Sequence, residues 1–223
     1  MAMKGTQAHL VWDWNGTLLD DISAVIEATN AAFAEIGLEP ITLERYRELY
    51  CVPIPRFYER LMGRLPSDAE WTVMDEAFHR HYVEHRIGCG LTTGVEELLR
   101  EWQVAGRSQS LLSMYGHDQL VPVVRDYGIE SRFIRVDGRT GPSGGTKALH
   151  MERHLGALAT SVVPERTVVI GDAVDDALAA AHVGARAVLF TGGSHSRSSL
   201  ESVGVPVVDT LAEAVEEALR LAS

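Results

Sequence analysis

Cysteine is scarce in this 223-residue chain, which contains only Cys51 and Cys89. Their spacing matches no metal-binding pattern. One disulfide is possible, but two reduced thiols in a cytoplasmic protein are the simpler interpretation. The chain also lacks any apolar run near the roughly 20 residues that a membrane-spanning helix needs. Its first residues lack the apolar stretch of a secretion signal. We therefore expect a soluble, cytoplasmic protein without a membrane partner.

Positive charge is limited as well. Lys and Arg together number 20 against 31 Asp and Glu, which gives a formal net charge of -11. This balance argues against a nucleic-acid partner, because such proteins usually present a basic surface. It is compatible with a protein that holds a divalent cation. Lysine itself occurs only as Lys4 and Lys147.

Short apolar runs rich in β-branched residues alternate with helical patterns over most of the chain. This alternation predicts βαβ units, and hence an α/β fold with a doubly wound parallel sheet and a Rossmann-like core. The predicted strands are His9–Trp12, Gln109–Leu112, Phe133–Val136, Thr167–Ile170, Ala187–Phe190 and Val205–Val208. The predicted helices are Val95–Gln103, Gln119–Tyr127, Lys147–Leu158, Asp175–His182 and Leu211–Leu221. The Gly- and Ser-rich stretch 192–199 is predicted to be a loop.

One segment, from about Ile22 to about Arg86, breaks this alternation and shows helical periodicity only. We expect two domains: an α/β core formed by residues 1–20 and 88–223, and a small all-helical domain formed by residues 21–87. The helical domain is inserted after the first strand. After a first helix that begins near Ile22, its predicted helices are Leu43–Tyr50, Arg56–Met62 and Asp68–Val83.

Polar residues follow several of the predicted strands. Asp13, Ser113 and Asp172 each follow an apolar run, and Lys147 begins a predicted helix. Ligands of an open parallel sheet bind outside the carboxyl ends of its strands, so we expect these side chains to converge. A carboxylate can act as a nucleophile on phosphorus, and carboxylate oxygens are ligands that Mg²⁺ prefers. A lysine together with a metal would offset the charge of a phosphoryl group in transfer.

This set resembles the four motifs of the haloacid dehalogenase superfamily, and the resemblance spans nearly the whole chain. The first motif, Asp-x-Asp-Gly-Thr, is represented by Asp13-Trp14-Asn15-Gly16-Thr17. The second is represented by Leu111-Leu112-Ser113, and the third by Lys147. The fourth, an apolar strand followed by Gly-Asp-x-x-x-Asp, is represented by Val168 to Asp176. The first and fourth motifs are specific, whereas the other two gain weight only from their order and spacing.

The resemblance implies a role for each of these residues. Asp13 would be the nucleophile that forms an aspartyl-phosphate, and it would also bind Mg²⁺. The backbone carbonyl of Asn15 and the carboxylate of Asp172 would complete the protein ligands, with Asp176 supporting the metal shell. Ser113 and Lys147 would hold the phosphoryl oxygens.

The helical insertion is similar to the cap of the phosphoglycolate phosphatase-like branch of that superfamily. Such a cap closes over the core site and selects the substrate, here a small phosphorylated metabolite. Thr17 is a candidate for substrate binding. Arg56, on a turn between cap helices, either faces the substrate or forms a surface salt bridge.

Asn15 departs from the pattern of the phosphatases, which have an Asp here to protonate the leaving oxygen and to activate water. An amide cannot exchange a proton at neutral pH. Three outcomes remain open: a slow phosphatase, which we favour, a leaving group that needs little protonation, or an acid–base group supplied from elsewhere. The candidates for such a group are His79, His81, His85 and His117.

Four other functions compete with a phosphatase. A metal-independent dehalogenase would also lack the second Asp of the first motif, but the intact segment from Gly171 to Asp176 favours a metal. A catalytically impaired sensor or partner protein is the non-enzyme alternative. The stretch from Gly141 to Ala148 superficially resembles a phosphate-binding P-loop but fails on both sides of Lys147. A phosphonate-cleaving enzyme would need a lysine in the cap, and none is present.

Several neighbouring residues are expected to be structural. Strand alternation predicts that Trp12 and Trp14 lie on the face opposite to Asp13, with one or both of them in the core. One of the two carboxylates at 175 and 176 is expected to be solvated. The histidine pairs at 81 and 85 and at 150 and 154 are expected on solvated helix faces, because neither pair has an evident third metal ligand.

Overall fold

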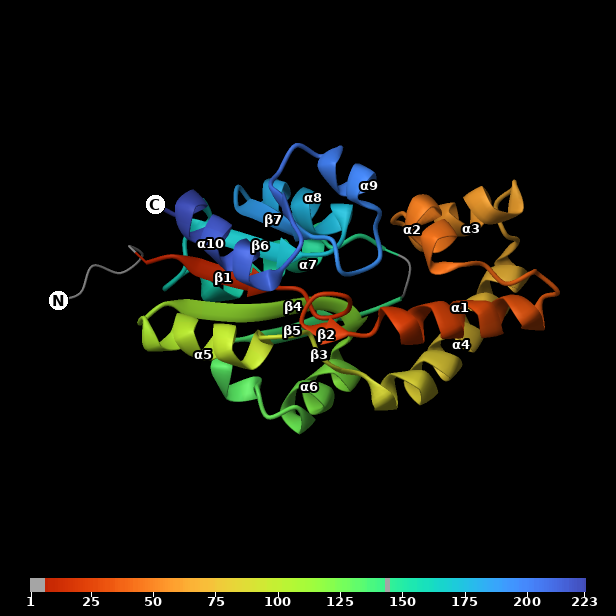
Figure 1. The fold of residues 1–223 in the computed structure, drawn as a ribbon, viewed down its shortest axis with the longest axis horizontal. Coiled ribbons are helices and arrows are strands. Elements are labelled where there is room, and N and C mark those ends of the chain that lie inside the picture. The colour runs from red at the N-terminus through yellow and green to blue at the C-terminus, as the bar shows by residue number, and fades with distance from the viewer. Residues whose placement is uncertain (1–6, 143–144) are drawn as a thin grey trace.

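A computed structural model describes residues 7–142 and 145–223. A parallel six-stranded sheet forms its centre, in the order β5-β4-β1-β6-β7-β8. Its strands are β1 (His9–Trp12), β4 (Ser108–Gly116), β5 (Val136–Arg139), β6 (Thr167–Gly171), β7 (Arg186–Phe190) and β8 (Val207–Val208). The register places Val11 of β1 between Ser110 of β4 and Val169 of β6. The predicted doubly wound α/β fold is confirmed (Figure 1).

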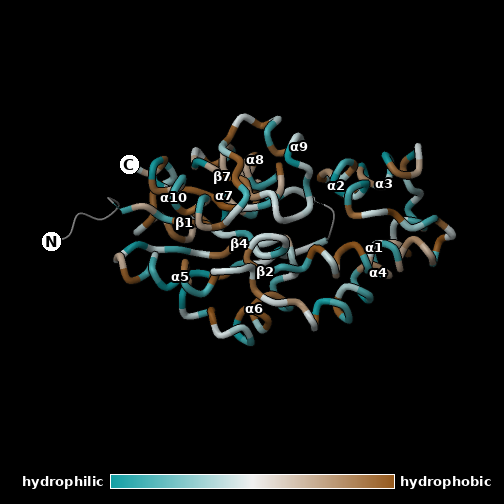
Figure 2. The backbone as a smooth tube through the Cα atoms, in the orientation of Figure 1, coloured by the Kyte–Doolittle hydropathy of each residue, from teal (hydrophilic) through white to brown (hydrophobic). Residues whose placement is uncertain are grey.

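Helices cover both faces of this sheet. The core helices are α5 (Val95–Val104), α6 (His117–Asp126), α7 (Ala148–Leu158), α8 (Val174–His182), α9 (Arg197–Glu201) and α10 (Leu211–Leu221). Leu10 and Trp12 belong to the hydrophobic cluster that includes α5, α6 and α10. Val11 belongs to the second cluster, with α7, α8 and α9. In Figure 2 the tube of β7 is brown, whereas much of α5 is teal. The assignment of Leu10, Val11 and Trp12 to alternate clusters shows that successive side chains of β1 are buried on opposite faces of the sheet, as strand geometry requires.

Four helices follow β1 in the sequence and precede the next strand of the sheet, β4. We call them the cap helices: α1 (Ile22–Glu35), α2 (Leu43–Leu49), α3 (Ile54–Met62) and α4 (Asp68–His85). They form the right-hand part of Figure 1. Their own buried cluster contains Phe33, Tyr46, Phe57, Tyr58 and Met74. At the base, a two-stranded antiparallel ribbon joins β2 (Leu19–Asp20) to β3 (Gly90–Leu91).

Local sequence explains where several of these helices begin. At the start of α4, Ser67 Oγ accepts a hydrogen bond from the Glu70 backbone N–H, and the Glu70 carboxylate accepts one from the Ser67 N–H. Thr210 and Glu213 form the same reciprocal pair at the start of α10. Each pair satisfies backbone donors that the first turn of a helix leaves without partners.

Some predicted boundaries were wrong. The third strand begins at Val136 rather than at Phe133, because Val136 is the residue in register with Leu111, while Ile134 is half exposed. Strand β4 continues to Gly116, so Ser113 lies within the strand. Helix α9 occupies the end of the predicted 192–199 loop, and β8 is only Val207–Val208. The ribbon of β2 and β3 was not predicted. The stretch 141–148, which was compared with a P-loop, includes residues 143–144, and these lie outside the described part of the chain.

Two predictions of solvent exposure were also wrong. His154 is buried, because it shares the inward face of α7 with Met151 and Leu155, and its ring nitrogens contact Asp137 Oδ2 at 2.7 Å and Ser110 Oγ at 2.8 Å. Asp175 and Asp176 are both buried, since each carboxylate accepts hydrogen bonds within the site. Trp12 and Trp14 are fully buried, as predicted.

Candidate active site

The carboxyl ends of the central strands bring the predicted polar residues together. Asp13 directly follows β1, and its backbone N–H donates to Ile170 O on β6 at 2.9 Å. Asp172 follows β6, while Ser113 comes from β4 on the other side of β1. Because these three strands are parallel neighbours, the side chains that leave their carboxyl ends share one edge of the sheet. The predicted convergence is therefore what the fold produces.

Three carboxylates meet at this edge. Asp13, Asp172 and Asp176 are buried, and each offers an oxygen within 4.8 Å of the others. Asp172 accepts hydrogen bonds from the Ser194 backbone N–H at 2.6 Å and from Thr17 Oγ1 at 3.3 Å. Asp176 Oδ2 accepts one from the Ala173 N–H at 3.0 Å. The protein thus holds the two carboxylates beyond β6 in fixed positions.

Glycines allow the backbone to approach these carboxylates closely. Gly16 has φ of +68°, in the left-handed region, and a Cβ there would lie 2.7 Å from Asp172 Oδ2. A Cβ on Gly193 would lie 2.0 Å from the same oxygen. Real Cβ atoms do not occur at such separations, so any side chain at either position would displace Asp172. This requirement gives the glycine of the first motif a physical reason.

Lys147 lies directly before α7 and extends its side chain into the carboxylate cluster. Its Nζ donates to Asp13 Oδ1 and, at 2.5 Å, to Asp176 Oδ1. Its backbone N–H donates to Asp175 Oδ2 at 2.7 Å. Burial opposes the charged ammonium, but the adjacent carboxylates of Asp13 and Asp176 raise the pKa of Lys147 above its usual value. The ammonium is therefore held protonated at the centre of the site.

Negative charge exceeds positive charge in this buried cluster, since three carboxylates face one ammonium. Burial raises the pKa of Asp13 above its usual value, against the opposing effect of Lys147. Burial, followed by the neighbouring Asp176, raises the pKa of Asp172 to about 6. A bound cation would relieve this charge imbalance. The atoms that could bind the cation are all carboxylate oxygens, which are hard ligands that fit Mg²⁺ and not a soft metal.

Asn15 is fixed by a hydrogen-bonded group that involves the cap. Its Nδ2 donates to Asp21 Oδ2 at 2.7 Å and to Tyr82 Oη at 2.6 Å. Tyr82 Oη in turn donates to Asp21 Oδ2 at 2.5 Å, and the Gly16 backbone N–H donates to Asp21 Oδ1 at 2.7 Å. A carboxylate accepts only, so Asp21 requires the amide nitrogen of Asn15 on its side. The amide oxygen therefore faces Ser113, whose Oγ donates to it at 3.4 Å.

Asp21 and Tyr82 were missed by the sequence reasoning. Asp21 follows an acidic neighbour directly before α1, a position where an Asp is usually a helix N-cap, yet its side chain makes no capping hydrogen bond. It is instead fully buried, and burial raises the pKa of this carboxyl group. Tyr82 is one of several aromatic residues in α4, and no sequence pattern distinguishes it from a core residue.

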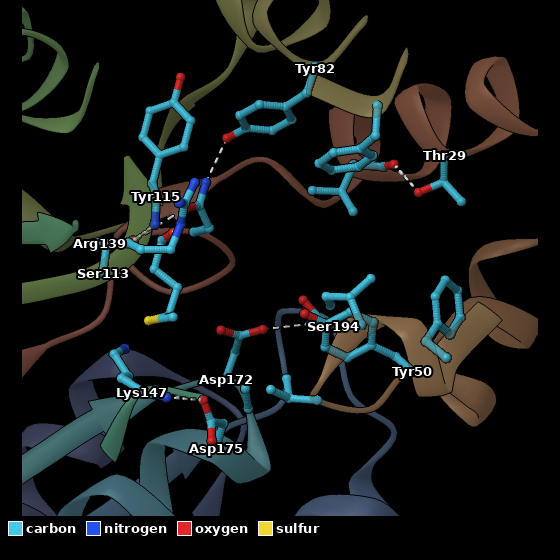
Figure 3. Close-up of a pocket in the computed structure, with 18 of the residues that line it drawn as sticks. Thr29, Tyr50, Tyr82, Ser113, Tyr115, Arg139, Lys147, Asp172, Asp175 and Ser194 are labelled. Carbon is cyan, nitrogen blue, oxygen red and sulfur yellow. Dashed lines mark hydrogen bonds between the residues drawn. The ribbon is translucent and has the colours of Figure 1, made fainter. Parts of the chain in front are cut away.

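A cavity of about 240 Å³ lies between the carboxylate cluster and the cap helices (Figure 3). Asp13, Asn15, Ser113, Lys147, Asp172 and Asp176 line its core side. Tyr50 and Tyr82 line it from the cap, together with other aromatic side chains from α2, α3 and α4. The arrangement can thus hold a small molecule whose one end contacts the carboxylate cluster and whose other end contacts the cap.

Other predicted residues lie elsewhere. Thr17 is fully buried behind Asp172 and is not among the described residues that line the cavity. Arg56, also outside that lining, forms an exposed ion pair with Glu59 at 2.6 Å. Of the four histidines considered as proton donors, only His79 lines the cavity within the described chain. The other three contact residues away from it: His81 with Glu35, His85 with Glu27, and His117 with the Gly138 backbone.

Comparison with known proteins identifies the family. A sequence model described as haloacid dehalogenase-like hydrolase matches residues 8–184. The chain belongs to this family. It is 26% identical over 198 residues to a phosphoglycolate phosphatase of Synechococcus elongatus, covering 86% of this chain and 87% of that protein. It is 26% identical over 188 residues to a phosphoglycolate phosphatase of Cereibacter sphaeroides, covering 82% of this chain and 85% of that one.

The fold of this haloacid dehalogenase-like hydrolase is shared with solved structures. One is a predicted phosphatase from Clostridium acetobutylicum, with a TM-score of 0.83 at 15% identity, covering 97% of this chain and all of that one. The predicted relationship to the phosphoglycolate phosphatase-like branch is confirmed by these matches. Within residues 7–142 and 145–223, no helix is both long and apolar enough to cross a membrane.

Proposed function

We propose that this hydrolase is a Mg²⁺-dependent phosphatase that acts on a small phosphorylated metabolite through an aspartyl-phosphate on Asp13. The observation that carries the proposal is the position of Asp13, next to the Lys147 ammonium and within a cluster of three buried carboxylates that opens into the cavity. The curated relatives named above are phosphoglycolate phosphatases, which supports the reaction class.

Asp13, Asp172 and the backbone carbonyl of Asn15 would hold the metal, with Asp176 in support. Mg²⁺ bound there would neutralise phosphoryl charge and orient the phosphoryl group toward Asp13. Lys147 and Ser113 would hold the phosphoryl oxygens, because both side chains carry donors at the carboxylate cluster. Thr17 would act on the substrate only through Asp172, the residue it contacts. Arg56 would bind a substrate only if the cap moved, because its guanidinium now pairs with Glu59.

The reaction would proceed in two steps. A carboxylate oxygen of Asp13 forms a bond to phosphorus while the ester P–O bond breaks, and the electron pair of that bond leaves on the ester oxygen. Water then attacks phosphorus, its proton passes to solvent, and the electrons of the P–O bond to Asp13 return to the carboxylate. Asn15 Oδ1 can accept a hydrogen bond from that water but cannot take its proton. Turnover is therefore expected to be slow, by up to the 10²–10⁴-fold that general acid–base catalysis supplies.

We also propose that the division between the two domains lies at residues 21–87, as the sequence predicts. The ribbon of β2 and β3 supports this division, because both connections between the cap helices and the core pass through it. Such a ribbon would let the cap helices move as a unit relative to the sheet.

Phosphate release from a panel of phosphomonoesters tests the proposed function. The wild-type protein is assayed with Mg²⁺ and with EDTA, next to Asp13→Asn and to Arg45→Ala as an exposed control. We expect EDTA and Asp13→Asn to abolish phosphate release, and ³²P from a labelled ester to remain on wild-type protein after a rapid acid quench. Unchanged activity in Asp13→Asn would refute the nucleophile.

Two alternatives give other results in the same assay. A metal-independent dehalogenase would release halide from a 2-haloacid in the presence of EDTA and would release no phosphate. A catalytically impaired sensor or partner protein would bind Mg²⁺ and inorganic phosphate by calorimetry without turning over any ester. Asn15, whose amide cannot act as a general acid or base, is the residue that favours this second alternative.

A further inference from the structure

The cap side of the cavity is built from aromatic side chains. Tyr46, Tyr50, Phe57, Tyr58, Trp71 and Phe78 all line it, and we call this group the aromatic wall. The rings contact one another closely: Tyr46 stacks on Tyr50 with centroids 5.1 Å apart, and Phe57 meets Tyr46 edge-on at 5.0 Å. Such contacts fix ring positions, so the wall presents a rigid apolar surface.

Aromatic rings also line another side of the cavity. Tyr82 stacks on Phe78 at 5.8 Å and meets Tyr115 edge-on at 5.8 Å. Figure 3 places Tyr82 and Tyr115 on one side of the space and Tyr50 on another, with Asp172 and Lys147 at its base. A flat apolar group attached to a phosphoryl group at the base would therefore lie between aromatic side chains.

Charge on the cap side argues against a second anionic group on the substrate. Among the described lining residues that the cap contributes, none is Lys or Arg, and Asp75 adds a carboxylate. The one imidazole of that lining, His79, lies with its Nε2 3.5 Å from Asp75 Oδ1, so this carboxylate already faces it. On the core side, Arg139 lines the cavity, and its Nε and Nη1 donate to the backbone carbonyls of Met114 and Gly141, which hold the guanidinium on the core side and not at the aromatic wall. A carboxylate placed against the aromatic wall would be desolvated without a cation, which is costly.

The amide at position 15 adds an independent constraint on the leaving group. An aliphatic alkoxide is about as basic as hydroxide, whose conjugate acid has a pKa of about 15.7, and it needs a proton as it departs. A phenolate, with a conjugate-acid pKa of about 10, is a far weaker base. Asn15 Nδ2 is directed at Asp21 and Tyr82, and an amide cannot supply that proton.

We propose that the substrate class is an aryl phosphate monoester without a carboxylate, with its ring against the aromatic wall. This inference rests on the proposed phosphatase function. Asp13 forms the bond to phosphorus, the aryl–oxygen–phosphorus linkage breaks at the P–O bond, and the electron pair leaves on the phenolate oxygen, which takes a proton from solvent. The ring supplies binding, and the weak basicity of the phenolate replaces the missing general acid.

Three phosphate esters and one acyl phosphate separate the two requirements. Phenyl phosphate has a ring and a weakly basic leaving group, benzyl phosphate has a ring and an alkoxide, acetyl phosphate has only the weakly basic leaving group, and 2-phosphoglycolate has neither. We expect kcat/KM with Mg²⁺ to be highest for phenyl phosphate. It should exceed the benzyl value by about 10²-fold or more, the usual contribution of general acid catalysis. The value for 2-phosphoglycolate should be the lowest of the four.

Variants then assign each requirement to its residues. Exchanging the amide and carboxylate in Asn15→Asp/Asp21→Asn keeps the local hydrogen-bonding groups and should reduce the phenyl-to-benzyl ratio at least tenfold. It should leave the phenyl-to-acetyl ratio within about twofold. Tyr50→Leu should lower the phenyl-to-acetyl ratio by about 2- to 10-fold, the usual worth of an aromatic pair. Val73→Ala, on the exposed face of α4, is the matched control and should change neither ratio.

The outcomes distinguish this inference from the proposed function. If 2-phosphoglycolate or benzyl phosphate is hydrolysed as efficiently as phenyl phosphate, and Asp13→Asn abolishes that activity, the function stands and the substrate class is refuted. If Tyr50→Leu and Val73→Ala behave alike, the aromatic wall has no role in recognition and the inference again fails. If none of the four compounds releases phosphate in an Asp13-dependent manner, the proposed function itself has failed.

Discussion

The amide of Asn15 is oriented by its hydrogen bonds to Asp21 and Tyr82. These three residues together determine whether position 15 presents a donor or an acceptor to the site. Asp21 Oδ2 accepts hydrogen bonds from both Asn15 Nδ2 and Tyr82 Oη. The buried carboxylate therefore determines which atom of Asn15 faces Ser113. An amide turned the other way would present two donors toward Ser113 and could not orient an attacking water by accepting its hydrogen bond.

A double-mutant cycle on Asp21→Asn and Tyr82→Phe tests this group. We expect each substitution to lower the free energy of unfolding by about 1–3 kcal/mol, because each leaves a buried polar partner unsatisfied. The double variant should lose less than the sum, with a coupling of at least about 0.5 kcal/mol. Urea unfolding measures all three. Tyr127→Phe removes a hydroxyl that donates to Cys89 O and is the control, expected to add to Asp21→Asn without coupling. Additive losses at Asp21 and Tyr82 would contradict the shared hydrogen-bonded group.

Among the elements, helix α2 of the cap contacts the loop that follows β7. Arg47 Nε donates to Gly193 O at 2.8 Å, and its Nη2 donates to Gly192 O at 2.9 Å. The Ser196 backbone N–H donates back to Arg47 O at 3.1 Å. Ser194, which follows Gly193 in this loop, donates its backbone N–H to Asp172 Oδ2. The same loop therefore connects the cap to the carboxylate cluster.

Arg47→Ala should weaken the closed arrangement of cap and core. We expect KM for phenyl phosphate to rise about tenfold, equivalent to about 1.4 kcal/mol, since two charge-assisted hydrogen bonds are lost while the carboxylate cluster is retained. Steady-state kinetics measure the change. Arg45→Ala, which removes an exposed ion pair with Glu48 on the same helix, is the matched control and should leave KM unchanged. Equal effects of the two substitutions would show that the Arg47 contact does not stabilise the closed cap.

In the molecule as a whole, a series of buried side-chain hydrogen bonds links β1 to α7 across the core. His9 contacts Ser108 Oγ and Ser110 Oγ, each at 2.8 Å, and His154 contacts the same Ser110 Oγ. Burial, followed by repulsion from His154, lowers the pKa of His9 to about 3. The folded protein therefore keeps His9 neutral at pH values where an unfolded chain would protonate it.

The pH dependence of stability follows from this shift. Between pH 6.5 and about 3, the unfolded state binds a proton at His9 and the folded state does not, so the free energy of unfolding falls as pH falls. This contribution is fully present above pH 6.5. His9→Gln keeps a hydrogen-bonding side chain but cannot titrate. Urea unfolding at several pH values from 7 to 4.5 should therefore give the wild type a steeper decline than the variant. The comparison cancels the carboxylates common to both proteins, and parallel curves would contradict the assignment.

At the level of elements, sequence periodicity was sufficient wherever burial alone determined the structure. The apolar run at Thr167–Ile170 and the helical stripe of Leu211–Leu221 were both predicted within a residue of their observed bounds. Phe133 was misplaced because its apolar side chain packs against the core from outside the strand. Pairing register decides where such a strand begins, and register depends on the partner strand.

The sequence by itself determined the α/β fold, the cap insertion and the set of Asp13, Ser113, Lys147 and Asp172, because motif order and hydrophobic pattern are local properties of a chain. Only the tertiary structure decided that Asp21 and Tyr82 orient Asn15 and that aromatic side chains from three cap helices face one cavity. The contact between Asn15 and Tyr82 spans 67 positions of sequence, and it exists only after the cap packs onto the core. Asn15, read from sequence as a missing acid, is in the folded protein an oriented acceptor beside an aromatic cavity.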